Sequence, residues 1–358
     1  MTDRLRVLTL LSGLAIGDTG GGADKLGLEV ARHLDRDRFE PIVCAFWQRG
    51  YAAEEHWRET LLADGVQVFF AAPRGPRFSL RGYAGGLRRI VAETRPGVAI
   101  VHSHFQLGSI AAILLRRSLH AQGLVRTAHG TALHEWSNHP IGRLCRFVFT
   151  RSLFPLVFDQ EIGVSAASAD SLNEAWGTRV ARKPAIMIPN AIPPAAPASV
   201  DREAKRQELG FEPGEIVIGS VGRLSEQKGY VYLVRAAPFI FARHPEARIT
   251  LTGDGELRGA LEQEARNLGV AERIRFLGLR TDVPDIYRAL DLFVSPSLWE
   301  GLPTVVLEAM AYGAPVVATG IPGTRDLLVD GYNGWLARPA DPADLARAVL
   351  TALENRAA

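Results

Sequence analysis

The fold is decided by a stretch that runs Ser295-Pro-Ser-Leu-Trp-Glu-Gly-Leu-Pro-Thr-Val-Val-Leu-Glu-Ala-Met-Ala-Tyr-Gly313. The apolar run 291–295 that leads into it is typical of a buried strand. Pro303 suits the first position of a helix, where its missing N–H costs nothing, and Gly313 supplies the left-handed residue that ends one. Since residues 314–319 begin another strand, the stretch predicts a strand, a tight loop, a short helix and a strand.

The start of this helix suits an anion. The backbone N–H groups of Gly301, Leu302 and Thr304 have no intrahelical acceptor and lie at the positive end of the helix, where a phosphate fits. Two carboxylates, Glu300 and Glu308, flank this point. A carboxylate does not serve an anion, but it does suit the hydroxyls of an attached sugar or ribose. A plain capped helix with one solvated Glu would show the same residues.

The Glu-x7-Glu pattern resembles the signature of the retaining nucleotide-sugar glycosyltransferases of family four, which have the glycosyltransferase-B fold. The resemblance covers nearly the whole chain, and several motifs recur in the expected order. It implies that Glu300 contacts the donor sugar and that Glu308 holds the ribose. It also implies that the diphosphate is held by the segment between them, Gly301, Leu302, Pro303 and Thr304.

A second motif, Gly222-Arg-Leu-Ser-Glu-Gln-Lys-Gly229, follows the predicted strand 217–221. Arg223 offers a rigid fork for two phosphate oxygens, and Lys228 adds a mobile positive charge. Such charged hydrogen bonds contribute about 1.5–3 kcal/mol each. Against a leaving diphosphate they strengthen as charge develops, which lowers the barrier. A lone Arg-x4-Lys is usually a solvated turn, but this one is similar to the family's Gly-Arg-Leu-x3-Lys-Gly.

Two further turns of the second half are expected at the donor. The strand 249–252 leads into Gly253 and Asp254, a turn that would line a nucleotide pocket. Arg280 follows Phe276-Leu-Gly-Leu, where relatives hold the base through main-chain groups. The resemblance therefore implies donor contacts at Gly253, Asp254 and Arg280, and it leaves the base open.

The first half opens with a strand at 6–12 and a glycine loop, Gly20, Gly21 and Gly22, that begins a helix running to about residue 34. This order allows close backbone approach to a diphosphate, although a plain strand–helix turn would look alike. The spacing also departs from G-x-G-x-x-G. The resemblance implies that the loop faces the donor, and Asp24 stands where the family has Glu.

Histidines follow two strands of the first half. His102-Ser-His104 is the pattern of a metal pair, but no third ligand lies at a convincing spacing, so a polar cluster at the strand end is the preferred interpretation. His129 comes at a strand end before Gly130, where ligands gather in a parallel sheet. On its own a strand-end His is more often structural. The resemblance implies that His129 faces the donor sugar.

Residues 142–158 mix three Arg residues with Phe and Leu. Such a segment could contact lipid. The preferred interpretation is a helix packed within the first domain, because Phe149 and Phe154 do not form one apolar stripe.

Strands alternate with helices along both halves, which predicts an α/β protein of two doubly wound, Rossmann-like domains. A chain of 358 residues also exceeds what one core usually serves. The Pro-rich run 188–197 marks the boundary. We expect an acceptor-side domain at 1–190, a linker at 191–214 and a donor domain at 215–358, facing each other across a cleft.

The charge of +2 is unevenly spread: residues 1–195 hold 23 Lys/Arg against 17 Asp/Glu, and the remainder holds 18 against 22. A basic first half fits an anionic acceptor or an acidic membrane surface, and no nucleic acid is expected. Only two cysteines, Cys44 and Cys145, are present, so no disulfide framework is implied. The N-terminus enters a strand without a signal peptide, which predicts a cytoplasmic protein, peripheral to the inner face of the plasma membrane if that contact exists.

No apolar strand ends in an Asp-x-Asp of metal-binding type, since Asp35-Arg-Asp37 lies at a charged helix terminus. Arg223, Lys228 and the helix amides would then balance the phosphate charge without a metal or another cofactor. We expect a retaining transferase that moves a hexose from a UDP- or GDP-sugar to a carbohydrate or lipid-linked hydroxyl. Domain closure would bring His129 over the sugar and exclude water. Cell-envelope, polysaccharide or glycolipid biosynthesis is the expected setting.

Two other classes stay open. A nucleotide-sugar epimerase or hydrolase on the same plan would need acid/base carboxylates near His129, which the sequence does not offer, and it would consume donor without acceptor. A silent nucleotide-sugar-binding subunit would bind donor without turnover. Relatives usually continue with a helix that crosses back onto the first domain, whereas this chain stops soon after the predicted helix 342–353. A truncated chain or a different mode of closure is expected to explain this.

Overall fold

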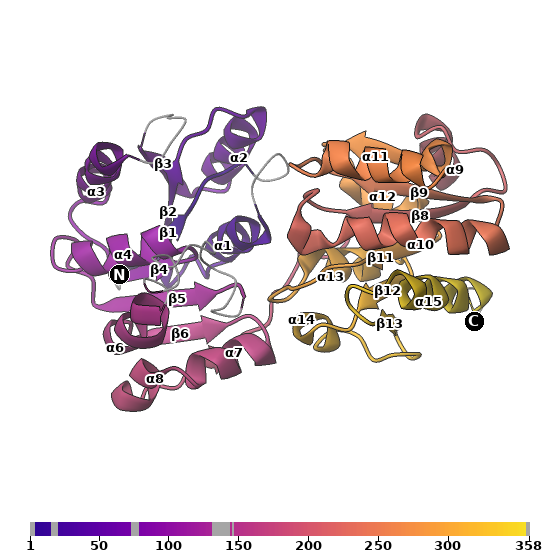
Figure 1. Cartoon of the computed structure of the whole chain (residues 1–358). Helices are drawn as coiled ribbons and strands as arrows, with labels where there is room; N and C mark the ends of the chain where they lie inside the picture. Colours follow the sequence, from indigo (N-terminus) through magenta and orange to yellow (C-terminus); the bar gives the residue numbers. More distant parts are fainter. Residues whose placement is uncertain (1–3, 16–20, 73–78, 131–143, 145–146, 356–358) are drawn as a thin grey trace. The chain divides into compact units, whose positions relative to one another are not determined.

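The computed structural model describes residues 4–15, 21–72, 79–130, 144 and 147–355. It divides into two compact units, Met1–Asn190 and Ala191–Ala358, so the division falls within the Pro-rich run. Each unit is a parallel sheet with helices on both faces (Figure 1). The α/β class and the two doubly wound domains are therefore confirmed.

The first unit contains a seven-stranded sheet in the order β3-β2-β1-β4-β5-β6-β7. Its strands are β1 (Leu5–Leu11), β2 (Phe39–Trp47), β3 (Gln67–Ala72), β4 (Ile100–Ser103), β5 (Gly123–Ala128), β6 (Gln160–Gly163) and β7 (Ile186–Met187). Its helices are α1 (Gly22–Arg32), α2 (Ala52–Ala63), α3 (Leu80–Glu93), α4 (Gln106–Leu115), α6 (Phe154–Val157), α7 (Ala166–Asn173) and α8 (Trp176–Ala181), with a π-helical turn at Phe149–Leu153. The order reverses beside β1, where ligands bind in doubly wound sheets.

The second unit repeats this plan in a six-stranded sheet of order β10-β9-β8-β11-β12-β13. Its strands are β8 (Ile216–Val221), β9 (Ala247–Thr252), β10 (Ile274–Gly278), β11 (Leu292–Ser295), β12 (Val316–Thr319) and β13 (Trp335–Ala337). Its α-helices are α9 (Arg202–Glu208), α10 (Tyr230–Arg243), α11 (Arg258–Asn267), α12 (Val283–Ala289), α13 (Thr304–Ala311), α14 (Pro322–Arg325) and α15 (Pro342–Glu354).

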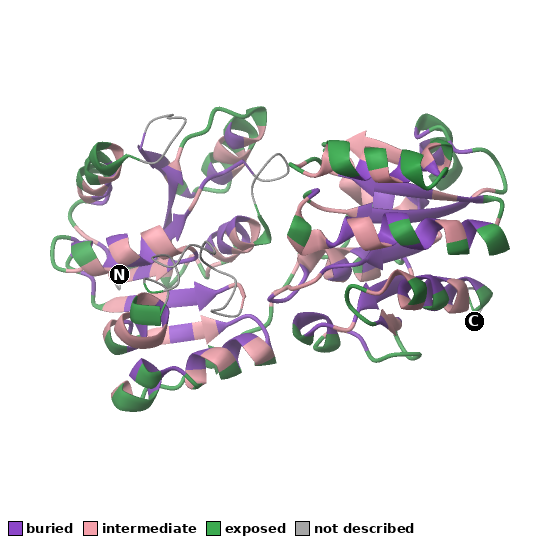
Figure 2. Ribbon diagram, in the orientation of Figure 1, coloured by how far each residue is buried: buried purple, intermediate pink, exposed green. Residues whose placement is uncertain are grey.

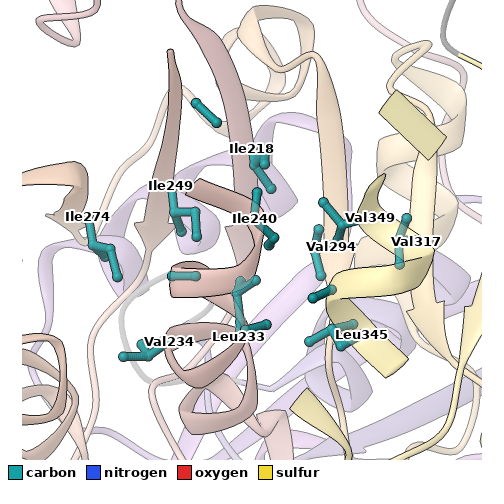
Figure 3. Close-up of a cluster of buried hydrophobic side chains, with 14 of the residues drawn as sticks. Ile218, Leu233, Val234, Ile240, Ile249, Ile274, Val294, Val317, Leu345 and Val349 are labelled. Carbon is teal, nitrogen blue, oxygen red and sulfur yellow. The ribbon is translucent and has the colours of Figure 1, made fainter. Parts of the chain in front are cut away.

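Alternation along the central strands of the second unit builds a core on each face of the sheet. Ile218 and Val294 point to one side, where they meet Leu233 of α10 and Val349 of α15 (Figure 3). Their neighbours Val217, Phe293 and Val316 join the core on the other side, beneath α12 and α13. Because both faces are covered, the central strands are mainly apolar and lie buried in the middle of the unit (Figure 2).

The predicted linker at 191–214 contains a helix of the second unit. α9 packs against α12, and its Arg206 is buried. Arg206 Nη2 lies 2.6 Å from Asp291 Oδ2, and its Nε donates to the carbonyl of Ala289. These charged bonds fix the second half of the predicted linker to the end of the sheet at which β11 begins.

The aromatic segment 142–158 is split by the fold. Phe154 and Phe158 lie in the core of the first unit, as the preferred interpretation requires. Phe147 and Val148 are exposed. Most of residues 142–146 lie outside the described part of the chain. Within the part that the structure describes, no helix combines the length and the apolar character that crossing a membrane requires.

A buried ion pair joins two neighbouring strands of the first unit. Arg126 of β5 and Glu161 of β6 are direct partners in the register, with 2.8 Å between Nη1 and Oε1. Their side chains are only 4% and 5% exposed. The guanidinium also lies 4.9 Å from the ring centre of Phe154. Removing either side chain would take the ion-pair partner from the other buried charge, which is costly.

We expect Glu161→Leu to destabilise the first unit by about 3–5 kcal/mol, because it removes the carboxylate that pairs with the buried Arg126 charge. The double variant Arg126→Met/Glu161→Leu should recover most of that loss. Glu55→Ala, which breaks the exposed pair with Arg58, is the control and should leave the stability nearly unchanged. Urea unfolding of the full chain measures all three. A loss below about 1 kcal/mol for Glu161→Leu would contradict this account.

Candidate functional site

Loops from four strands of the second unit meet at the carboxyl edge of its sheet, and glycines allow the contact. A Cβ on Gly253, after β9, would collide with the carbonyl oxygen of Gly222, after β8. A Cβ on Gly229 would collide with the carbonyl oxygen of Pro296, after β11. Gly323, after β12, approaches the carbonyl of Gly301 in the same way. The loops therefore touch backbone to backbone, and no larger residue fits between them.

Backbone hydrogen bonds hold these loops in register. Gly222 N donates to the carbonyl of Thr252 over 2.9 Å, and Gly253 N donates to that of Gly278 over 2.8 Å. Leu298 N donates to the carbonyl of Gln227 over 2.8 Å. The two sequence motifs of the second half are thereby fixed against each other.

Lys228 and Glu300 form the charged centre of this edge. Lys228 Nζ lies 2.6 Å from Glu300 Oε1, and the two side chains are 19% and 9% exposed. Ser297 Oγ donates to the same oxygen over 3.0 Å, while Gln227 Nε2 lies 3.3 Å from Oε2. The carboxylate is thus held by three donors. Arg223 lies on the same loop as Lys228, after β8, and is exposed.

The helix after this loop starts one residue later than the sequence predicts. Pro303 is the N-cap, with φ −71° and ψ 105°, and Thr304 is the first helical residue, so the assignment of Pro303 to the first helical position is wrong. Gly313 has φ 78° and ends the helix as expected. Gly301 and Leu302 lie just before the N-cap and are buried. Val306 N already donates to the carbonyl of Pro303 over 3.1 Å, so an anion at this positive end of the helix would bind the amides of Thr304 and Val305.

Glu308 lies in the second turn of α13 and is half-buried. Its Oε2 accepts a hydrogen bond from the Tyr287 hydroxyl over 3.0 Å. Glu300 thus lies in the loop before α13 and Glu308 in the second turn of that helix, each bound by a donor from another segment.

The other predicted donor contacts of the second unit lie on two loops. Gly253 is in the contact described above, and Asp254 beside it is exposed. Arg280 lies 2.5 Å from Asp282 and 2.7 Å from Glu208 of α9. These carboxylates raise the pKa of Arg280, and the guanidinium lowers the pKa of Asp282. Arg280 thus binds protein carboxylates here, and its contact with a donor stays a prediction.

In the first unit, the glycine loop is only partly described. Gly20 lies outside the described residues, whereas Gly21 is the N-cap of α1 and Gly22 is its first residue. Asp24 accepts hydrogen bonds from the backbone N and the hydroxyl of Ser12, over 2.8 and 2.6 Å. Burial raises the pKa of Asp24 despite these bonds. Asp24 therefore ties the start of α1 to the end of β1.

The three strand-end histidines form one chain of contacts. His104 Nδ1 lies 3.0 Å from His129 Nε2, the rings of His102 and His104 are 4.2 Å apart, and His102 Nε2 lies 2.8 Å from the Thr127 hydroxyl. Burial lowers the pKa of His102 to about 4 and that of His129 to about 3. Burial also lowers the pKa of His104 well below its ordinary value. The cluster is therefore neutral near pH 7, as the preferred polar-cluster interpretation requires.

The described residues contain no group of three or more His, Cys, Asp or Glu side chains placed to hold a metal ion. Cys44 is free and buried, and burial raises the pKa of its thiol.

Sequence reasoning missed four residues of the second unit's site. Gln227 and Ser297 contact Glu300, and both stand within the motifs, so their polar character was a usable signal. Tyr230 is buried beneath the loop after β8, where the Cβ position of Gly222 lies 2.9 Å from its hydroxyl. Tyr287 contacts Glu308 from the neighbouring helix α12. Nothing in the sequence separates these two tyrosines from core residues.

Comparison with known proteins shows which families this chain resembles. Residues 215–355 match the family model described as "Glycosyl transferases group 1", and residues 20–196 match "Glycosyltransferase Family 4". The chain is 28% identical over 316 residues to the putative glycosyltransferase EpsF of Bacillus subtilis, covering 87% of this chain and 78% of that protein. It is 30% identical over 295 residues to D-inositol 3-phosphate glycosyltransferase 2 of Catenulispora acidiphila, covering 77% and 67%.

Solved structures of other proteins have the same two-domain fold. HepE of Anabaena, crystallised with UDP and glucose, superposes with a TM-score of 0.80 at 25% identity, covering 98% of this chain and 90% of that one. Sucrose-phosphate synthase from Thermosynechococcus elongatus shares the fold, with a TM-score of 0.76 at 18% identity over 99% and 91% of the two chains. The two parallel-sheet units, the motifs and these relatives show that the chain belongs to the family four glycosyltransferases of glycosyltransferase-B fold and is itself a glycosyltransferase.

Proposed function

We propose that this glycosyltransferase moves a hexose from a nucleoside-diphosphate sugar to a hydroxyl acceptor, with retention of configuration and without a metal ion. The observation that carries the proposal is the Lys228–Glu300 pair, held beside the start of α13. One positive charge and one carboxylate lie side by side there, which supports a site for a phosphate and the sugar attached to it.

The diphosphate would be held by Arg223, Lys228 and the first-turn amides of α13. These donors stabilise the leaving group more strongly as negative charge develops on it, so their effect falls on the rate as well as on binding. The positive charge that a divalent cation would supply is then supplied by the protein. No protein carboxylate is assigned as a covalent nucleophile, and the departing phosphate would help to deprotonate the acceptor on the same face.

Glu300 would accept hydrogen bonds from hydroxyls of the donor sugar, and its three protein donors fix the carboxylate for that task. His129 is neutral, because burial lowers its pKa to about 3. Its contribution to the sugar would therefore be a hydrogen bond from a neutral imidazole and not a positive charge.

For the donor we propose a UDP-sugar first and a GDP-sugar second, since HepE of Anabaena has been crystallised with UDP-glucose. For the acceptor we propose a lipid-linked or free carbohydrate. A 28% identical Escherichia coli relative is named as a galactosyltransferase acting on a diphosphoundecaprenol-linked sugar. The exposed Phe147, Val148 and Trp176 of the basic first unit support peripheral contact with the cytoplasmic face of a membrane.

We expect Lys228→Ala and Glu300→Gln each to lower the transfer rate by about 100-fold or more, because each removes a group that acts on the reacting donor. Initial rates with UDP- and GDP-sugars and a panel of acceptors measure this, with circular dichroism to verify folding. Arg235→Ala, which breaks the exposed pair between α10 and α11, is the matched control and should retain activity. Near-normal turnover in either site variant would remove the proposed roles.

We also expect the correct donor to raise the melting temperature of the full chain equally with and without EDTA. At 100 times the dissociation constant, ligand binding adds about 2.7 kcal/mol of stability by mass action. The measurement is a thermal-shift screen of UDP- and GDP-sugars. A stabilisation that disappears on chelation and returns with a divalent cation would contradict metal independence.

A further inference from the structure

Tyr287 is buried directly beneath one of the two site carboxylates. It lies on α12 and is 1% exposed, and its hydroxyl donates to Glu308 Oε2 over 3.0 Å. The bond crosses from one helix to another, so it fixes Glu308 from outside its own helix. The inference below rests on the proposed function, which takes a nucleoside diphosphate at this edge.

The ring of Tyr287 cannot easily turn away. It stacks on Tyr312 at 5.8 Å with an interplanar angle of 8°, and its other contact is edge-on to Phe293 at 5.5 Å. Arg288 lies 4.7 Å from the Tyr312 ring centre. The position of the Tyr287 hydroxyl is therefore constrained by the rings of Tyr312 and Phe293.

A hydroxyl at this place costs stability unless it has an acceptor. The ring belongs to the apolar core that includes Ile286, Phe293 and Val306, where Phe would pack as well. Burial, together with the charge of Glu308, raises the pKa of Tyr287 well above its ordinary value. The phenol therefore stays protonated near neutral pH and donates its proton to Glu308 there.

We propose that Tyr287 is a positioning residue that fixes the Glu308 carboxylate toward the ribose hydroxyls of the bound nucleotide, and that it thereby sets the preference for ribonucleotides over deoxyribonucleotides. Glu308 lies in the second turn of α13, one turn from the amides that would hold the diphosphate. A carboxylate at that distance from a phosphate site suits the sugar that joins phosphate to base. The direction of its oxygens is set by the bond to Tyr287.

The test separates this role from a purely structural one. Calorimetry on the full chain would give the dissociation constants of UDP, of 2′-deoxy-UDP and of 3′-deoxy-UDP, and likewise for GDP. Wild type should prefer the ribonucleotide. Tyr287→Phe should reduce that preference by about 10-fold, the size of one hydrogen bond to a charged group. The loss should come from weaker UDP or GDP binding, with little change for the deoxy analogue.

Two further variants sharpen the result. Tyr312→Phe keeps the ring stack and should keep the wild-type preference. In a Glu308→Gln background, Tyr287→Phe should change the preference no further, because Tyr287 acts through Glu308. If Tyr287→Phe does not fold, Glu308→Asp withdraws the carboxylate without altering the core, and a preference that survives this change overturns the proposal.

Equal weakening of both nucleotides in Tyr287→Phe would also overturn it, since that result marks general destabilisation. So would an unchanged preference. Failure of wild type to bind any of these nucleotides is a different outcome, which rejects the proposed function itself and the inference with it.

Discussion

Backbone contact between loops is the constraint on which the second unit's site depends. The chain after β8 and the chain after β11 approach so closely that Gly229 has only the carbonyl of Pro296 where a side chain would stand. Gly253 meets Gly222 in the same way. A methyl group at either place would force a carbonyl aside and carry the loop of Lys228 with it. The position of the charged centre therefore depends on glycines at the points where these loops touch.

Both site carboxylates are held by donors that approach from neighbouring segments. Glu300 is bound by Lys228 from the loop after β8, and Glu308 is bound by Tyr287 from α12. The Glu300 side chain is 9% exposed, so its bonds act in a medium where electrostatic interactions are stronger than in water. Holding both groups before a ligand arrives lowers the ordering cost of binding.

The sequence predicted both sheets because most of their strands are buried on two faces and appear as short, mainly apolar runs. It placed the motif loops correctly at strand ends, but it could not show that Lys228 contacts Glu300, 72 positions away in the chain. Helix α9 escaped notice because its burial depends on charges such as Arg206 and not on an apolar stripe. Tyr287 escaped notice because an aromatic residue beside Ile286 in a short helix is typical of core packing. The start of α13 differed by one residue because Pro303 is extended.

The neutral histidines of the first unit make its stability depend on pH, because they bind protons more readily in the unfolded chain than in the folded one. His102 and His129 titrate near pH 4 and pH 3 when folded, whereas a solvated imidazole titrates near 6.5. Above that value neither state binds the proton, and the folded arrangement retains its full stability. As the pH falls from about 6.5 toward 4, these histidines bind protons in the unfolded chain but not in the folded one. Acid therefore shifts the equilibrium toward unfolding. An arrangement that keeps a strand end polar yet uncharged thus makes this half of the enzyme sensitive to acid.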